Sequence, residues 1–431
     1  MGGQTGNATT HRRRVLQGLG ALSVSPLVTA NTAHPQKSDF PSVKALARDL
    51  VSAEVVPGVV VALGHGQEDP TFICHGTLGF GSEVAVDENT LWRIYSMTKP
   101  VAGMAAMLLI AQGRITLDQP IADFMPEFGT MQVLIDPKAG LAARPARNPI
   151  TVRHLLTHTS GIGAAIPMVG GPLIDAYTAV GLKRGVLDAD GAPDVPGAVT
   201  GLAEFARRLA TVPLEAEPGT HWRYSYGLDL IGRIVEIVSG QPFDAFLKQA
   251  FFDPLGMAST GFRVPAQDRM RLVDNYSTPY PADGSKATLI DPGAQSQFLK
   301  QPTYVSGGGG LVSTARDYDR FLAMLVGGGT FRGTTVLPPA AVAMGMSNLL
   351  PAGTNMNSYI FPGSGDGFGA GGRLVSSGPD KGTFGWMGAA GTLGTVNPDR
   401  RLRITGMLNC MNNMALPEQL PAAVNADWPA H

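Results

Sequence analysis

The sequence of 431 residues has little charge, and neither sign dominates. Charged residues make up 16% of the chain, and 33 Lys and Arg nearly balance 34 Asp and Glu, for a formal net charge of −1. No basic stripe is available to neutralise nucleic-acid phosphates, and no block of like charge marks a solvated tail. The hydrophobic fraction of 44% instead predicts a globular chain with a large buried core. We therefore expect neither DNA nor RNA as a partner.

Cysteine is also scarce, because Cys74 and Cys410 are the only two in the chain. Two are too few for a disulfide scaffold, and their spacing matches no zinc or redox motif. We expect two small buried side chains, while a disulfide formed in an oxidising compartment stays open. His154 and His158 lie four residues apart, but the glutamate of a zinc-protease helix is missing between them. We interpret both histidines and Arg153 as structural, and expect no metal and no cofactor.

Two common nucleophile and phosphate motifs are absent. No serine lies in the G-x-S-x-G arrangement of the α/β-hydrolases. The run Gly307 to Gly310 lacks the Lys-Ser/Thr continuation of a phosphate-binding loop. We interpret this run as a tight approach of a strand or as a flexible edge of a cleft.

The first residues have the pattern of an export signal. Basic residues 11–14 precede the uncharged apolar run 15–30. Arg12 and Arg13, followed by one residue and then Val15 and Leu16, resemble the twin-arginine pattern. The run is short and broken by glycine, so we expect no stable membrane insertion of the mature chain. Residues 1–33 are predicted to be a signal, and the rest of the chain to be periplasmic or secreted by a bacterium.

Apolar periodicity predicts strands near both ends of the chain and helices between them. A helix over residues 43–53 precedes a hairpin of strands 59–63 and 71–74, and later strands are predicted at 384–387, 392–397 and 402–408. Predicted helices cover residues 100–112, 152–158, 202–210, 228–239, 243–252 and 315–327. Residues 163–200 and 264–304 show no period and are predicted to be loops that form lids or cleft walls.

This order of elements predicts an α+β fold. We expect one antiparallel sheet from both chain ends, flanked by helices, with an inserted, mainly helical region. One predicted domain spans residues 34–425. Its sheet subdomain covers approximately residues 40–93 and 305–415, its helical subdomain approximately 94–304, and we expect a cleft between the two.

The chain contains one S-x-x-K motif, from Ser96 to Lys99, just before the predicted helix 100–112. Spacing of three residues places both side chains on one helical face. A nearby lysine can help remove the proton that makes a serine hydroxyl a poor nucleophile. A helix N-terminus adds positive potential there. The motif alone is weak evidence, since it also arises by chance.

Two further stretches follow the S-x-x-K motif along the chain. The first is Tyr224-Ser225-Tyr226, ahead of a predicted helix, and the second is Trp386-Met387-Gly388, on a predicted strand. This order resembles the serine β-lactamase and penicillin-recognising superfamily, in which S-x-x-K, Y-x-N and K-T-G line one cleft. Residues 150–161, 254–257 and 308–315 also look like that family. The resemblance extends from about residue 40 to residue 412 and implies the β-lactamase/transpeptidase fold.

Two departures from the family pattern concern specificity. Tyr226 replaces the Asn of Y-x-N, and Trp386-Met387-Gly388 replaces K-T-G. Both look like the class-C-like carboxylesterases, often called family VIII esterases, and the related acyltransferases. The missing Asn and Lys help β-lactamases to hold the amide and carboxylate of a β-lactam. The resemblance therefore implies a small-molecule ester substrate.

The resemblance also implies a role for each site residue. The catalytic residues would be the nucleophile Ser96, with Lys99 and Tyr224 sharing the transfer of protons. The backbone N–H groups of Ser96 and Ala389 would form the oxyanion hole. Substrate would be bound by Tyr226, Trp386, Met387 and Gly388. Tyr224 as an ordinary core tyrosine and Trp386 as a plain pocket wall stay open.

Alternative functions share the same acyl-enzyme chemistry. They are a D-Ala-D-Ala carboxypeptidase, a weak β-lactamase and an acyltransferase. A non-catalytic penicillin-recognising binding domain is the alternative from another class. It has no need of Ser96, Lys99 and Tyr224 together, so we expect a serine carboxylesterase-type hydrolase.

Overall fold

The computed structural model describes residues 1–2, 39–163, 172–182, 197, 199–279, 286–357 and 365–428. The chain divides into two units, Met1–Ser38 and Asp39–His431. Apart from Met1 and Gly2, the predicted export signal lies outside the described residues. The helices and strands given below all belong to the second unit.

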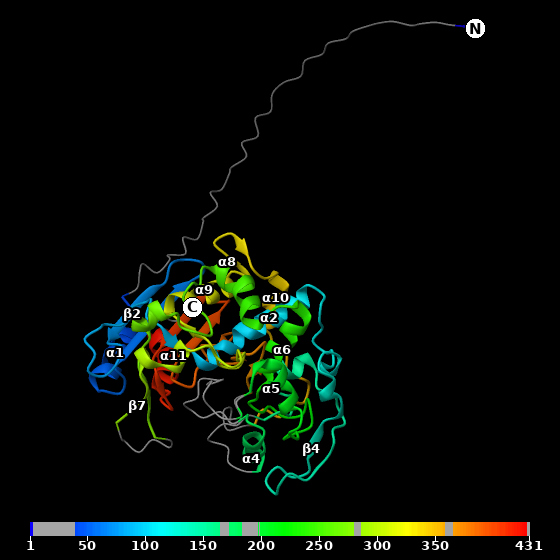
Figure 1. Ribbon diagram of the computed structural model, residues 1–431. Helices are drawn as coiled ribbons and strands as arrows, with labels where there is room; N and C mark the ends of the chain where they lie inside the picture. The colour runs from blue at the N-terminus through cyan, green and yellow to red at the C-terminus, as the bar shows by residue number, and fades with distance from the viewer. Residues whose placement is uncertain are drawn as a thin grey trace. The chain divides into compact units, whose positions relative to one another are not determined.

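A seven-stranded antiparallel sheet joins the two ends of this unit, in the order β11-β12-β13-β14-β15-β1-β2. The N-terminal β1 pairs with the C-terminal β15 from Val60↔Met407 to His65↔Leu402. Figure 1 shows these blue and red segments side by side. The predicted sheet from both chain ends is therefore confirmed. Its strands are β1 (Gly58–His65), β2 (Thr71–Gly76), β11 (Gly367–Phe368), β12 (Arg373–Leu374), β13 (Phe384–Met387), β14 (Leu393–Asn397) and β15 (Leu402–Met407).

The sheet separates two hydrophobic cores because successive side chains of a strand face opposite sides. In β1, Val60 belongs to the larger core, while Val59 and Val61 belong to the smaller one. Helices α1 (Pro41–Ser52) and α11 (Ala415–Asp427) cover the smaller core, and α9 (Ala315–Val326) packs on the other face. Helix α11 continues beyond the predicted domain end at residue 425.

Helix α2 (Thr98–Ala111) lies at the centre of the larger core and packs against α6 and α10. It begins before the predicted start at residue 100 and is buried on almost every side. Gly103 is required there, since a Cβ at this position would lie 2.1 Å from the Ala370 carbonyl oxygen.

Further α-helices are α3 (Val152–Leu156), α5 (Gly201–Leu209), α6 (Gly227–Ser239), α7 (Phe243–Leu247), α8 (Asp253–Leu255) and α10 (Pro339–Gly345). The predicted helix 243–252 is interrupted by a π-helical turn, Lys248–Phe252.

The two predicted long loops contain regular structure. Residues 163–200 include helix α4 (Pro172–Ala179). Residues 264–304 include β6 (Asn275–Ser277) and β7 (Thr288–Asp291), and β6 runs parallel beside β16 (Cys410–Met411). A strand from the predicted helical subdomain thus pairs with one from the predicted sheet subdomain. Strands this short are too brief to show a hydrophobic period.

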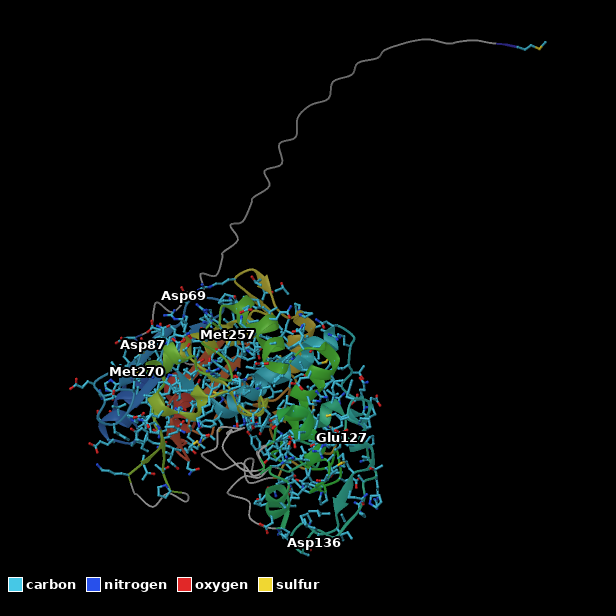
Figure 2. The ribbon with its side chains drawn as sticks, in the orientation of Figure 1. Asp69, Asp87, Glu127, Asp136, Met257 and Met270 are labelled. Atoms are coloured by element: carbon cyan, nitrogen blue, oxygen red, sulfur yellow. The ribbon has the colours of Figure 1, made fainter. Side chains whose placement is uncertain are left out.

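Three small strand pairs complete the described fold: β3 (Trp92–Arg93) with β8 (Val312–Ser313), β4 (Gln132–Leu134) with β5 (Ala143–Pro145), and β9 (Thr330–Phe331) with β10 (Thr334–Thr335). Figure 2 shows Asp136 at the outer tip of the β4–β5 hairpin. Among the described helices, none is long and apolar enough to cross a membrane.

The two cysteines are both free thiols. Cys410 on β16 is buried, as predicted, but Cys74 on β2 is exposed. Since alternate residues of an edge strand face opposite sides, Cys74 lies on the side away from Ile73, which is buried. The prediction of two buried cysteines was wrong for Cys74.

Candidate active site

Ser96 lies in a short 3₁₀ turn, Tyr95–Met97, that leads directly into α2. The preceding residue, Tyr95, has a left-handed φ of 42°, a conformation that costs energy for a bulky side chain. The Tyr95 hydroxyl accepts a hydrogen bond from the Asn275 side chain at 2.8 Å. Strained backbone of this kind is concentrated at functional sites, and here it directly precedes Ser96.

Lys99 occupies the first turn of α2, one helical turn beyond Ser96. Its ammonium Nζ donates to Ser96 Oγ at 3.1 Å, so the S-x-x-K spacing does bring the two side chains together. A second hydrogen bond from Nζ goes to the carbonyl oxygen of Gly308. The lysine is only 1% exposed, and a cation buried this deeply needs such acceptors.

Tyr224 approaches Ser96 from the extended stretch before α6. Its hydroxyl lies 2.6 Å from Ser96 Oγ, and the Lys99 ammonium lies 4.5 Å from the centre of its ring. Lys99 Nζ and Tyr224 OH therefore both converge on Ser96 Oγ. Tyr224 is half-buried. An ordinary core tyrosine would have neither this exposure nor this partner.

Trp386 lies on β13 beside Tyr224. The two rings stack with centroids 6.0 Å apart, and the indole Nε1 donates to the Tyr224 hydroxyl at 3.5 Å. Trp222 and Phe368 pack around them to form a small aromatic cluster. The triplet Trp386-Met387-Gly388 stands where the family pattern has K-T-G, and its tryptophan places an indole at the edge of the Ser96 site.

The turn after β13 packs against the backbone that precedes Ser96. A Cβ at Gly388 would lie 2.5 Å from the Ile94 carbonyl oxygen, so only glycine fits there. Thr392 Oγ1 donates to the same carbonyl at 3.4 Å. Ala389, the next residue, is exposed. This packing brings the Ala389 segment to the 3₁₀ turn that carries Ser96.

Two residues predicted to bind substrate point elsewhere. Tyr226 is 1% exposed, its hydroxyl donates to the Leu182 carbonyl at 2.7 Å, and its ring packs against Phe205. Met387 packs on the opposite side of β13 from Trp386, against the core of α1 and α11. Neither side chain is placed to hold a substrate at Ser96, because α6 begins right after Tyr226 and strand residues alternate in direction.

His158 contacts the site, which the sequence did not reveal. Its ring lies 4.8 Å from that of Tyr224, and Nδ1 is 2.8 Å from Ser225 Oγ. Complete burial, together with the charge of Lys99, holds the pKa of His158 well below its usual range. The imidazole is therefore neutral and supports Tyr224 by packing. The helix predicted to reach residue 158 ends at Leu156, and His158 takes a left-handed φ of 57°.

His154 is structural, as predicted. It forms a capping box with Thr151 at the start of α3, in which Nδ1 accepts from the Thr151 amide at 3.2 Å. Burial lowers the pKa of His154 to about 4.

Low pH should lower the stability of the folded chain, because His154 then becomes protonated. The neutral form is favoured in the folded chain, so stability is complete above the unfolded pKa of about 6.5 and falls as the pH drops toward 4. Protonation of one such histidine lowers the free energy of unfolding by about 1.4 kcal/mol for each pH unit that the pH falls in this window. Urea unfolding between pH 7.5 and 5 should show a shallower pH dependence for His154→Gln, since glutamine can keep the capping box. An exposed histidine variant, His75→Gln, is the control, and identical slopes for wild type and His154→Gln would contradict the assignment.

Comparison with known proteins gives consistent relationships in sequence and in fold. The family model described as Beta-lactamase matches residues 43–426. Protein Rv1367c of Mycobacterium tuberculosis is 32% identical over 371 residues, which cover 83% of this chain and 87% of the relative. Esterase EstB of Burkholderia gladioli is 33% identical over 247 residues, 54% of this chain and 57% of the relative. The solved structure of EstCE1, a hydrolase with promiscuous acyltransferase activity, has a TM-score of 0.72 at 24% identity and covers 89% of this chain and 97% of that one.

Proposed function

The chain belongs to the β-lactamase family and is a serine hydrolase of the esterase-like kind; from this premise we propose that it cleaves small carboxylic esters through an acyl-enzyme on Ser96. The observation that carries the proposal is the convergence of Lys99 Nζ and Tyr224 OH on Ser96 Oγ, at 3.1 and 2.6 Å. Both lie within the distance at which a general base can take a proton.

Acylation begins when Ser96 Oγ attacks the ester carbonyl carbon and its proton passes to the Tyr224–Lys99 pair. The Lys99 ammonium beside the phenol ring stabilises negative charge on Tyr224. The tetrahedral oxyanion is held by the backbone N–H groups of Ser96 and Ala389. Collapse expels the alcohol, which receives the proton, and leaves the acyl group on Ser96. Water, deprotonated by the same pair, then releases the acid.

The residues around Ser96 favour esters over β-lactams. Trp386 presents an apolar indole where the family pattern has a lysine, and Tyr226 is turned into the core, so it supplies no amide. Loss of one hydrogen bond to a charged group typically costs about 1.5 to 3 kcal/mol, which is roughly a 10- to 150-fold loss in rate. An uncharged ester does not depend on either lost group.

A panel of substrates tests this proposal on the purified chain. p-Nitrophenyl esters of increasing acyl length, a D-Ala-D-Ala peptide and a chromogenic cephalosporin are assayed side by side, with Ser96→Ala as the blank. We expect kcat/KM for the best ester to exceed that for the cephalosporin by at least about 10²-fold, because two favourable contacts are missing. Comparable values would restore the lactamase interpretation, and preferred cleavage of the peptide would favour a carboxypeptidase. Product analysis with an added alcohol separates hydrolysis from acyl transfer.

The export signal at residues 1–33, and with it a periplasmic or secreted location, stays a prediction. Its basis is the basic cluster followed by an uncharged apolar run.

A further inference from the structure

Building on the proposed function, we propose that Asp229 is a positioning residue: it fixes the Ser306–Gly308 loop so that the Gly308 carbonyl holds the Lys99 ammonium against Ser96. Asp229 lies in the first turn of α6 and is fully buried. Its carboxylate accepts hydrogen bonds from Ser306 and Gly308, and the proposed effect on catalysis passes through Gly308 and Lys99.

Two hydrogen bonds attach the loop to the carboxylate. Ser306 Oγ donates to Asp229 Oδ1 at 2.5 Å, and the Gly308 amide donates to the same oxygen at 3.2 Å. The carbonyl of Gly308 then accepts from Lys99 Nζ. One residue, Gly308, is therefore held by Asp229 at its nitrogen and holds Lys99 at its oxygen.

Glycine is required for the loop to lie this close to the start of α6. A Cβ on Gly307 would meet the Leu228 carbonyl oxygen at 2.3 Å, and a Cβ on Gly308 would meet Asp229 Oδ2 at 2.6 Å. The glycine run was predicted to be a tight strand approach or a flexible cleft edge; the approach is tight, but it is made to the start of helix α6.

The start of α6 positions both groups that form hydrogen bonds with Ser96, the Tyr224 hydroxyl directly and the Lys99 ammonium through the glycine loop. Tyr224 lies just before α6 and Asp229 in its first turn, so the phenol and the loop that holds Lys99 are fixed to one rigid element. Helix N-termini stabilise carboxylates, and hydrogen bonds to a charged acceptor are stronger than neutral ones. The carboxylate therefore holds the loop by stronger hydrogen bonds than a neutral side chain would form.

The decisive variant is Asp229→Asn, which keeps the shape and an acceptor oxygen but removes the charge. We expect kcat for the best ester to fall by about 10- to 100-fold with KM nearly unchanged, on the scale of one charge-assisted contact. A purely structural role for Asp229 would instead lower the melting temperature and leave kcat of the folded variant near the wild-type value.

Asp317→Asn is the matched control. Asp317 is also a buried carboxylate in the first turn of a helix, α9, and it also accepts two hydrogen bonds, from Ser259 and Thr260. Its carboxylate accepts from Ser259 and Thr260 rather than from the loop that holds Lys99, so its loss should lower stability and leave kcat unchanged.

The rate of Ser96 labelling by a fluorophosphonate separates this inference from the proposed function. Slower labelling in Asp229→Asn than in Asp317→Asn supports the inference whatever the ester preference. Wild-type rates of labelling and ester hydrolysis in folded Asp229→Asn would overturn the inference and leave the proposed function intact. If Asp229→Asn does not fold, Ser306→Ala takes its place, and an unchanged kcat there overturns the inference. A wild type that neither labels nor hydrolyses esters refutes both.

Discussion

Replacing Ser96 with alanine should reduce kcat for ester hydrolysis by about 10⁴-fold or more, the scale seen when a serine nucleophile is removed. The reason is geometric, because Lys99 Nζ and Tyr224 OH both form hydrogen bonds with Ser96 Oγ. Intact-mass analysis of the wild type after treatment with a fluorophosphonate should show one adduct, and peptide mapping should place it on Ser96.

Ser347→Ala removes an exposed serine near the end of α10 and serves as the control for this experiment. It should keep both the adduct and the activity. An adduct on another serine, or full ester hydrolysis by Ser96→Ala, would end the assignment of the nucleophile.

Tyr224→Phe should lower kcat by about 10²-fold or more, the usual contribution of a general acid or base. The ring would still stack on Trp386 and lie beside the Lys99 ammonium, so KM and the melting temperature should change little. Steady-state kinetics and a thermal melt measure both quantities on the same preparation.

Tyr226→Phe is the matched control, since it removes the same atom two residues away. Its hydroxyl donates to Leu182 in the core, so the variant should lose about 1 kcal/mol of stability and keep its kcat. A Tyr224→Phe enzyme with near-normal kcat would make Tyr224 a wall of the cleft, and the two variants together distinguish chemistry from packing.

The sequence by itself determined the fold class and the family resemblance, and it predicted Ser96 as the nucleophile. Strand and helix periods are local properties, so strands near both chain ends and one antiparallel sheet made from them could be predicted, and the pairing of β1 with β15 confirms that sheet. The Ser96–Lys99 contact is also local, because a spacing of three residues on a helix fixes the geometry before any tertiary packing.

Only the tertiary structure decided which neighbouring residues face Ser96. Tyr224 and Tyr226 are alike in the sequence, but the start of α6 turns one toward Ser96 and the other into the core. Asp229 and Gly308 are 79 residues apart in sequence, and no spacing rule connects them. Contacts of this length depend on how α2, α6 and the glycine loop pack together, since close packing is set by the shapes of whole elements.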